Sequence, residues 1–138
     1  MWRIQLPLPE EIMKNILLLA AINGFLVVAL GAFGAHGLES FLSEARLETW
    51  HTAVLYHMFH TLALLGVALL VRQANGNRWL LGSAQCFMAG LVLFSGSLYV
   101  LALTGISWLG VITPFGGIAL LAGWACLGYA AYVEFRHG

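Results

Sequence analysis

Charged residues are scarce along this chain. Only 9% of its 138 residues are Asp, Glu, Lys or Arg, whereas a soluble domain is about one quarter charged. Six Lys or Arg balance six Asp or Glu, and no basic block occurs, which excludes nucleic acid as a partner. Because 61% of the residues are apolar, too little polar surface is available to cover a soluble globule, and we expect a lipid bilayer around the chain.

Cysteine and the common catalytic patterns are also rare. The two cysteines, Cys86 and Cys126, lie in apolar runs without the spacing of a CxxC motif, so we expect small packing residues. The sequence contains no nucleophile–base–orienter triad and no Gly-rich phosphate loop. Charged residues are missing from the middle of every apolar run, which removes the usual parts of an ion-coupled transporter. We therefore expect a protein that is not an enzyme.

Four apolar runs are long enough to cross a bilayer, which takes about 20 residues. They lack the period of two that marks a β-barrel, and helices satisfy their own backbone groups in lipid. The sequence thus predicts an all-α, integral membrane four-helix bundle, with residues 1–14 as an interfacial lead-in to one membrane domain, 15–138. The first apolar run is longer than the apolar core of a signal peptide, so we expect it to remain in the mature protein as a membrane span. The predicted spans are 15–35, 50–71, 79–103 and 108–133.

Basic residues predict the orientation of the bundle. Arg46 is the only cation on one side, and the other five lie on the side of both termini. By the positive-inside rule, both termini are predicted to be cytoplasmic, in a bacterial inner membrane. Three tryptophans are predicted to anchor the interfaces: Trp50, Trp79 and Trp108. The five cations on the terminal side are Arg3, Lys14, Arg72, Arg78 and Arg136.

The connection between the first two spans mixes charged and apolar residues. Residues 38–49 carry Glu39, Glu44, Arg46 and Glu48 beside several leucines. At helical spacing this mixture is amphipathic. We expect a short amphipathic helix that lies over the outer surface of the bundle as a lid.

Polar side chains within the spans gather toward their outer ends. The neutral form of a histidine is satisfied by one donor and one acceptor. Hydrogen bonds from His57 and His60 to nearby hydroxyls or carbonyls would then hold two helices together. In the inner half, Asn23 and Gln85 are expected to bond within the bundle. The candidate polar pocket comprises His36, His51, His57, His60, Ser95, Ser97, Tyr99 and Thr113.

Three ligand chemistries stay open for this pocket, because an ionisable group inside a membrane is a functional hypothesis by default. Haem would need axial histidines from two helices, and only His36 lies on a helix other than that of the deep pair. A metal would use His36, His51 and His57 with Glu39 or Glu48. A quinone or lipid headgroup would bond to His57 or His60 and Tyr99. Cofactor and metal therefore remain unassigned.

Glycines recur at helical spacing on three of the spans. Small residues let helix backbones approach one another in lipid. We expect these positions to pack helices within one bundle or between copies, which favours a small accessory or assembly subunit that binds other membrane proteins or itself. The alternative is a ligand-binding membrane protein that uses the polar pocket. The packing positions are Gly31, Gly34, Gly82, Gly90, Gly116 and Gly123.

Four motifs occur in an order that resembles a known family. They are LGAFGAHGLE (30–39), YHMFHTLALL (56–65), LFSGSLYVLAL (93–103) and TPFGGIALLAGWA (113–125). This arrangement is similar to that of domain-of-unknown-function family 423, which comprises small bacterial inner-membrane proteins with a mitochondrial relative in animals. The resemblance covers residues 13–124. It implies a four-helix inner-membrane protein and no assigned activity.

Overall fold

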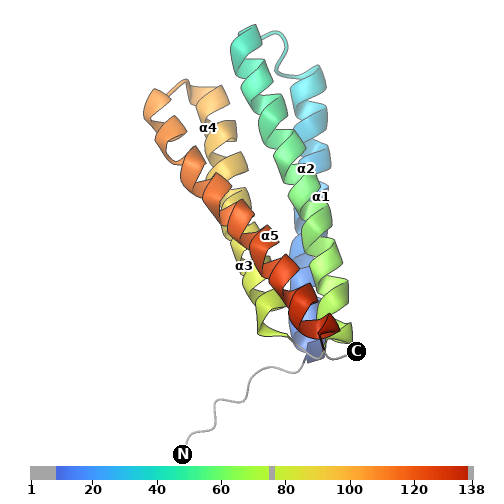
Figure 1. The fold of residues 1–138 in the computed structure, drawn as a ribbon. Coiled ribbons are helices and arrows are strands. Elements are labelled where there is room, and N and C mark those ends of the chain that lie inside the picture. Colours follow the sequence, from blue (N-terminus) through green and yellow to red (C-terminus); the bar gives the residue numbers. More distant parts are fainter. Residues whose placement is uncertain (1–8, 75–76, 137–138) are drawn as a thin grey trace, which may run out of the picture.

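The computed structural model describes residues 9–74 and 77–136, and these ranges are helical apart from short connections. Helices α3, η1 and α4 follow one another without a break and form one span, so four spans are long and apolar enough to cross a membrane. The predicted all-α, four-span architecture is confirmed (Figure 1). The elements are α1 Pro9–His36, α2 Glu44–Gln73, α3 Arg78–Gly90, the π-helix η1 Leu91–Gly96, α4 Ser97–Thr104, the 3₁₀-helix η2 Ser107–Val111 and α5 Thr113–Phe135.

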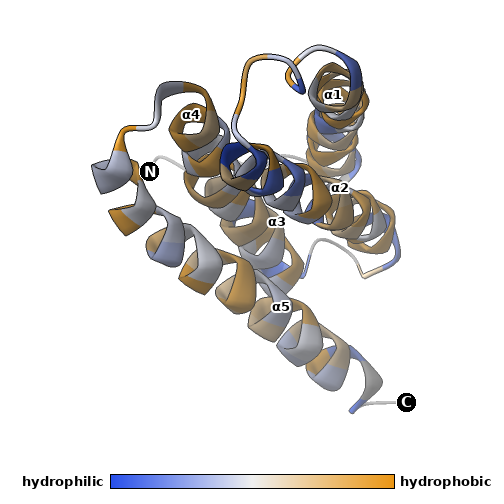
Figure 2. Ribbon diagram, turned by 90° about the horizontal axis from the view of Figure 1, so that it is seen from above, coloured by the Kyte–Doolittle hydropathy of each residue, from blue (hydrophilic) through white to orange (hydrophobic). Residues whose placement is uncertain are grey.

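The spans pack as two antiparallel pairs. Helix α1 packs almost entirely against α2, and α3 packs against α5. Contacts of α2 with α3, η1 and α4 join the two pairs. Seen from above, α1 and α5 lie on opposite sides of the molecule (Figure 2), and the pairs diverge toward the end that holds η2 (Figure 1).

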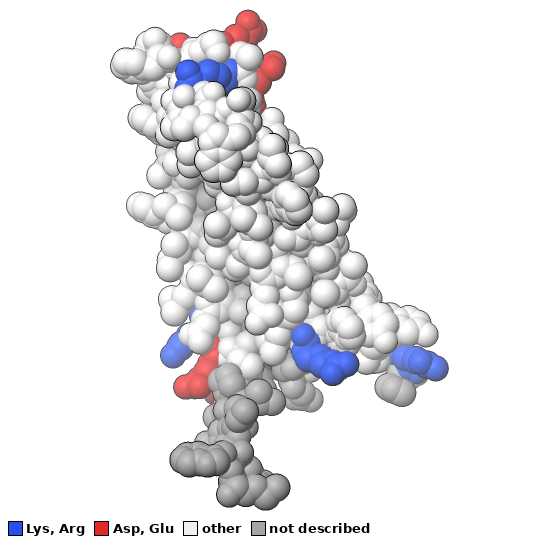
Figure 3. All heavy atoms as spheres, turned by 90° about the vertical axis from the view of Figure 1, so that its left-hand side faces the viewer, with Lys and Arg blue, Asp and Glu red and all other residues white. Residues whose placement is uncertain are grey.

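Charge is confined to the two ends of the bundle. On the face drawn in Figure 3, an uncharged band separates two ends that each carry basic and acidic residues. Large apolar side chains are exposed along this band on every span, including Phe25, Leu69, Val92 and Leu121. Such a surface suits the hydrocarbon core of a bilayer, which is about 30 Å thick.

The lead-in predicted over residues 1–14 falls partly outside the described residues, since 1–8 are not described. Pro9 to Lys14 are helical and form the first turns of α1. Glu10 and Glu11 lie in the first turn, where carboxylates interact favourably with the helix dipole.

The predicted amphipathic helix between the first two spans is wrong. Residues 37–43 form turns, and α2 then runs from Glu44 to Gln73. Ser43 begins it, because its hydroxyl accepts a hydrogen bond from the backbone N–H of Arg46 at 3.4 Å. No proline or glycine interrupts the chain from Glu44 to Leu65, so the polar residues continue directly into the membrane span. No separate lid forms.

Trp50 is part of the core and not an interface anchor, which corrects the expectation from sequence. Its side chain is 1% exposed, and its indole N–H donates to the carbonyl of Leu30 at 3.0 Å. The ring lies against Gly34, where a Cβ would approach the indole to 2.5 Å. Gly34 therefore makes room for Trp50 on α1. Trp108, by contrast, is exposed.

The glycines of α3 and α5 pack these two helices against each other. A Cβ on Gly123 would meet the Phe87 ring at 2.5 Å, and a Cβ on Gly116 would collide with the backbone of Phe94. A Cβ on Gly90 would likewise collide with Leu120. Gly31 and Gly82 make ordinary contacts with Val54 and Cys126. All six predicted packing glycines therefore face neighbours within this chain.

Arg46 connects the beginning of α2 to the end of α4. Its Nε donates to the carbonyl of Ala102 at 2.6 Å, and its Nη2 donates to that of Leu103 at 2.5 Å. These carbonyls belong to the last turn of α4, which ends at Gly105 in the left-handed conformation, φ 70°. A cation at a helix C-terminus interacts favourably with the dipole. The two helix pairs are thereby joined at their diverging end.

Candidate functional site: a polar cluster and an adjoining pocket

His57 links three helices through both of its ring nitrogens. The Asn23 side-chain nitrogen donates to the Leu19 carbonyl at 2.8 Å, which turns the Asn23 oxygen toward His57. That oxygen only accepts, so Nε2 of His57 carries the hydrogen and donates to it at 3.0 Å. Nδ1 then accepts from the Tyr99 hydroxyl at 3.1 Å. The buried ring is neutral, and it ties α2 to α1 and α4.

Asn23 is a member of this cluster that sequence reasoning placed elsewhere. The hydrogen bonds that we expected for Asn23 within the bundle are present. One of them joins it to His57, which the sequence had suggested lies at a different depth. The reason is the length of α2. Because this helix begins at Glu44, and not near Trp50, His57 lies close to its middle, at the depth of Asn23 in the middle of α1.

His60 links α2 to α5. Its Nδ1–H donates to the Tyr56 carbonyl at 2.8 Å, and its Nε2 accepts from the Trp124 indole N–H at 3.1 Å. Sequence reasoning missed Trp124 as a partner. The signal was a tryptophan within an apolar span, where its N–H needs an acceptor because lipid offers none.

The hydroxyl groups of the predicted pocket also join helices. Ser95 donates to the Ala53 carbonyl at 2.9 Å. Ser97 donates to the Phe94 carbonyl at 3.0 Å, and the Thr113 hydroxyl, 2.7 Å from that of Ser97, is then the donor between the two. Among the described residues, no buried side-chain nitrogen or oxygen lacks a hydrogen-bond partner. The cluster is therefore closed on itself.

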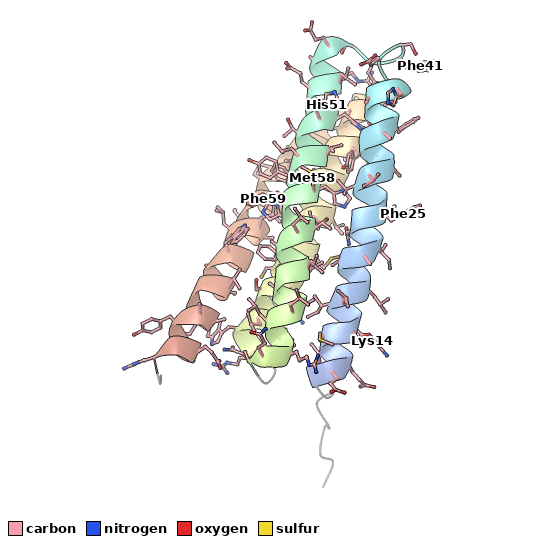
Figure 4. All side chains as sticks on the ribbon, turned by 90° about the vertical axis from the view of Figure 1, so that its right-hand side faces the viewer. Lys14, Phe25, Phe41, His51, Met58 and Phe59 are labelled. Carbon is pink, nitrogen blue, oxygen red and sulfur yellow. The ribbon has the colours of Figure 1, made fainter. Side chains whose placement is uncertain are left out.

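His36 and His51 do not join this cluster. Both are exposed, His36 at the last residue of α1 and His51 near the beginning of α2, and Figure 4 shows His51 near that end of its helix. Within the described ranges, no three His, Cys, Asp or Glu side chains come together as metal ligands. The set of His36, His51 and His57 with Glu39 or Glu48 is thus not assembled. Haem ligation by His57 or His60 would have to displace existing hydrogen bonds.

A pocket of about 710 Å³ lies beside His60, between α2 and α5. Its wall carries several rings, and Phe59 is seen on the side of α2 toward α5 in Figure 4. Phe94 reaches it from η1, where the wider π-turn places its ring 4.4 Å from that of Tyr56. The π-helix left no mark that sequence periodicity detects, so the pocket was missed. π-Turns are frequent at functional sites.

The comparison with known proteins identifies the family. The family described as "Protein of unknown function (DUF423)" matches residues 30–117. This chain belongs to that family. It is 49% identical to the UPF0382 membrane protein YwdK of Bacillus subtilis, over 86% of this chain and 97% of that protein. It is 45% identical to the UPF0382 inner membrane protein YgdD of Escherichia coli, over 83% of this chain and 86% of that protein. No solved structure matches the chain.

The resemblance expected from the four motifs is therefore confirmed, and DUF423 is a family of unknown function. Its matched range contains His57, His60 and Tyr99 and ends before Trp124. Chemically, the described site offers neutral, mutually bonded polar groups beside an apolar, ring-lined pocket. Such a site is suited to holding helices or an uncharged molecule.

Proposed function

We propose that this DUF423 protein is a non-enzymatic accessory or assembly subunit, and that it associates with other membrane proteins or with itself through the outward side of α1. The single observation that carries this proposal is the one-sided packing of α1. It has α2 as its one extensive neighbour within the described chain. Helix α5 also packs mainly against one span, that of α3 and η1, but it is joined to α2 as well through the Trp124–His60 hydrogen bond.

The outward side of α1 has the spacing of a helix–helix seam. Leu18, Phe25 and Val28 are 54%, 76% and 72% exposed, and Phe25 points away from the bundle in Figure 4. Together with the exposed Ala21 and Ala32, they follow one another at intervals of three and four residues. Small residues in such a seam allow a second helix to approach closely in lipid.

The internal use of polar groups supports a role without catalysis. His57, His60, Ser95, Ser97 and Thr113 are all engaged in hydrogen bonds between or along helices. A ligand at the predicted polar pocket would have to break these bonds. The predicted packing glycines contact neighbours within the chain, so they are not free to bind another protein. The outward side of α1 is therefore a better candidate for the association surface than the glycine positions.

We further propose a bacterial inner-membrane location with both termini cytoplasmic. Among the described cations, Lys14, Arg72, Arg78 and Arg136 lie at the end of the bundle that holds both termini, whereas Arg46 lies at the opposite end. This asymmetry follows the positive-inside rule. The Escherichia coli relative is itself called an inner membrane protein.

Photocrosslinking in cells tests the association surface. A photoreactive amino acid at Val28 should give a discrete protein adduct on irradiation. Val92 in η1 is the matched control, because it is also a valine and is 65% exposed to the bilayer. We expect protein adducts from position 28 and lipid adducts alone from position 92. Lipid adducts alone from position 28 would contradict the proposal.

A further inference from the structure

The pocket between α2 and α5 has no part in the association surface on α1. We propose that it binds a neutral, lipid-soluble molecule that combines a flat ring bearing a carbonyl group with an apolar tail, which is the chemistry of an alkyl or isoprenoid quinone. This goes beyond the accessory role, and it concerns a pocket bordered by α5, which lies on the opposite side of the molecule from α1 (Figure 2).

The rim of the pocket determines how a ligand would enter. Leu55 on α2 and Ile118 and Leu121 on α5 line it, and all three are exposed on the membrane-facing surface. A molecule dissolved in the bilayer can therefore enter sideways between the two spans. Among the described residues, no Asp, Glu, Lys or Arg lines the pocket, so a charged ligand would lose its hydration without gaining a counter-ion.

The wall of the pocket favours a flat ring over a plain acyl chain. Tyr56 lies 4.4 Å from Phe94, and Phe59 lies 5.7 Å from Trp124, measured between ring centroids. The His60 ring lies 6.1 Å from that of Trp124. Rings at these separations stack on one another in offset or edge-to-face geometry. A conjugated ring inserted among them gains the same contacts, whereas a saturated chain gains only apolar burial.

Among the described residues that line the pocket, Tyr56 has a polar group that is not committed to a hydrogen bond. The His60–Trp124 hydrogen bond closes the imidazole and the indole against each other. The Tyr56 hydroxyl makes no hydrogen bond within the described residues, although its ring lines the pocket. Lipid tails offer a hydroxyl no acceptor. A ligand carbonyl would supply one, and the volume of about 710 Å³ lies within the range of small-molecule sites.

Binding of a benzoquinone with a decyl tail to the protein in phosphatidylcholine nanodiscs tests this inference, with tryptophan quenching as the readout. In Gly117→Leu the new side chain enters the pocket, because a Cβ at Gly117 lies 3.8 Å from the Phe94 ring. Gly128→Leu is the matched control on the same helix, since a Cβ there meets nothing within 4 Å. We expect affinity to fall at least tenfold in the first variant and to stay unchanged in the second.

Tyr56→Phe adds no bulk and removes only the hydroxyl, so it keeps the test decisive even if Gly117→Leu does not fold. We expect it to weaken quinone binding by about threefold to tenfold, the range of one net hydrogen bond. Decylbenzene, which has the ring and tail without a carbonyl, should compete poorly. Equal affinity in all variants, or equally strong competition by decylbenzene, would overturn the proposal.

Discussion

The imidazole of His57 has two nitrogens, and each reaches a different helix. Asn23 of α1 accepts from one, and Tyr99 of α4 donates to the other. The arrangement uses the neutral ring as both donor and acceptor, which avoids the cost of a charge in lipid. In the same way, His60 joins α2 to α5 through Trp124. At this scale the histidines are connectors between helices.

His57→Ala should therefore destabilise the bundle. The Asn23 oxygen and the Tyr99 hydroxyl would lose their partner in a region that water does not reach. We expect the free energy of unfolding in micelles to fall by about 1–2 kcal/mol. His51→Ala, at an exposed position on the same helix, should change it little. If both variants have the same free energy of unfolding as the parent protein, the hydrogen bonds of His57 contribute no stability.

Among the elements, α5 approaches the backbone of the span that contains η1 closely enough to exclude a Cβ. Gly116 lies against the backbone of Phe94, and Gly123 lies against the Phe87 ring. Backbone cannot move aside as a flexible side chain can. Ser83 adds a hydrogen bond across the same contact, from its hydroxyl to the Gly123 carbonyl at 2.8 Å.

Gly116→Leu should consequently disrupt the fold of a single copy. Overpacking against backbone costs about 1–3 kcal/mol or more. We expect a lower unfolding midpoint in micelles that hold one copy of the chain, with Gly128→Leu as the neutral control. A Gly116→Leu variant of parental stability that only fails to associate would restore a role for this glycine between copies.

The positions of the spans could be predicted from sequence, because runs of apolar residues reflect the thickness of the bilayer directly. The residue at which each helix begins could not be predicted in the same way. Helix α2 starts among polar residues that lie beyond the lipid, and the apolar run does not reveal them as helical. That error separated Asn23 from His57 and assigned Trp50 to the interface. Trp50 is buried because Gly34 leaves space on a neighbouring helix, a pairing that the spacing on one helix does not show.

On the scale of the whole molecule, the pattern is two charged ends with an uncharged band between them (Figure 3). The polar cluster was predicted in part: His57 and Tyr99 do meet, but Asn23 and Trp124 were not expected as partners of the histidines. The pocket between α2 and α5 was not predicted, because it depends on a π-turn and on the divergence of two helix pairs. Both arise from packing between elements distant in sequence.

Reporter fusions test the proposed orientation. Alkaline phosphatase, which is active only outside the cytoplasm, should be active when fused after Ser40 and inactive when fused to the C-terminus. The physical reason is the excess of cations at the terminal end of the bundle. A cytoplasmic fluorescent protein should give the reverse pattern. Activity of the phosphatase at the C-terminus would invert the topology.

The Arg46 contact bears on the order in which the chain assembles. As the polypeptide is made, α2 is complete before Ala102 and Leu103 have been added to the chain. Until the last turn of α4 has formed, the Arg46 guanidinium has no helix carbonyls to bind and is hydrated by water. Its two hydrogen bonds close only at that moment. The contact thus marks the arrival of the third crossing, and it fastens the earlier pair of helices to the later one.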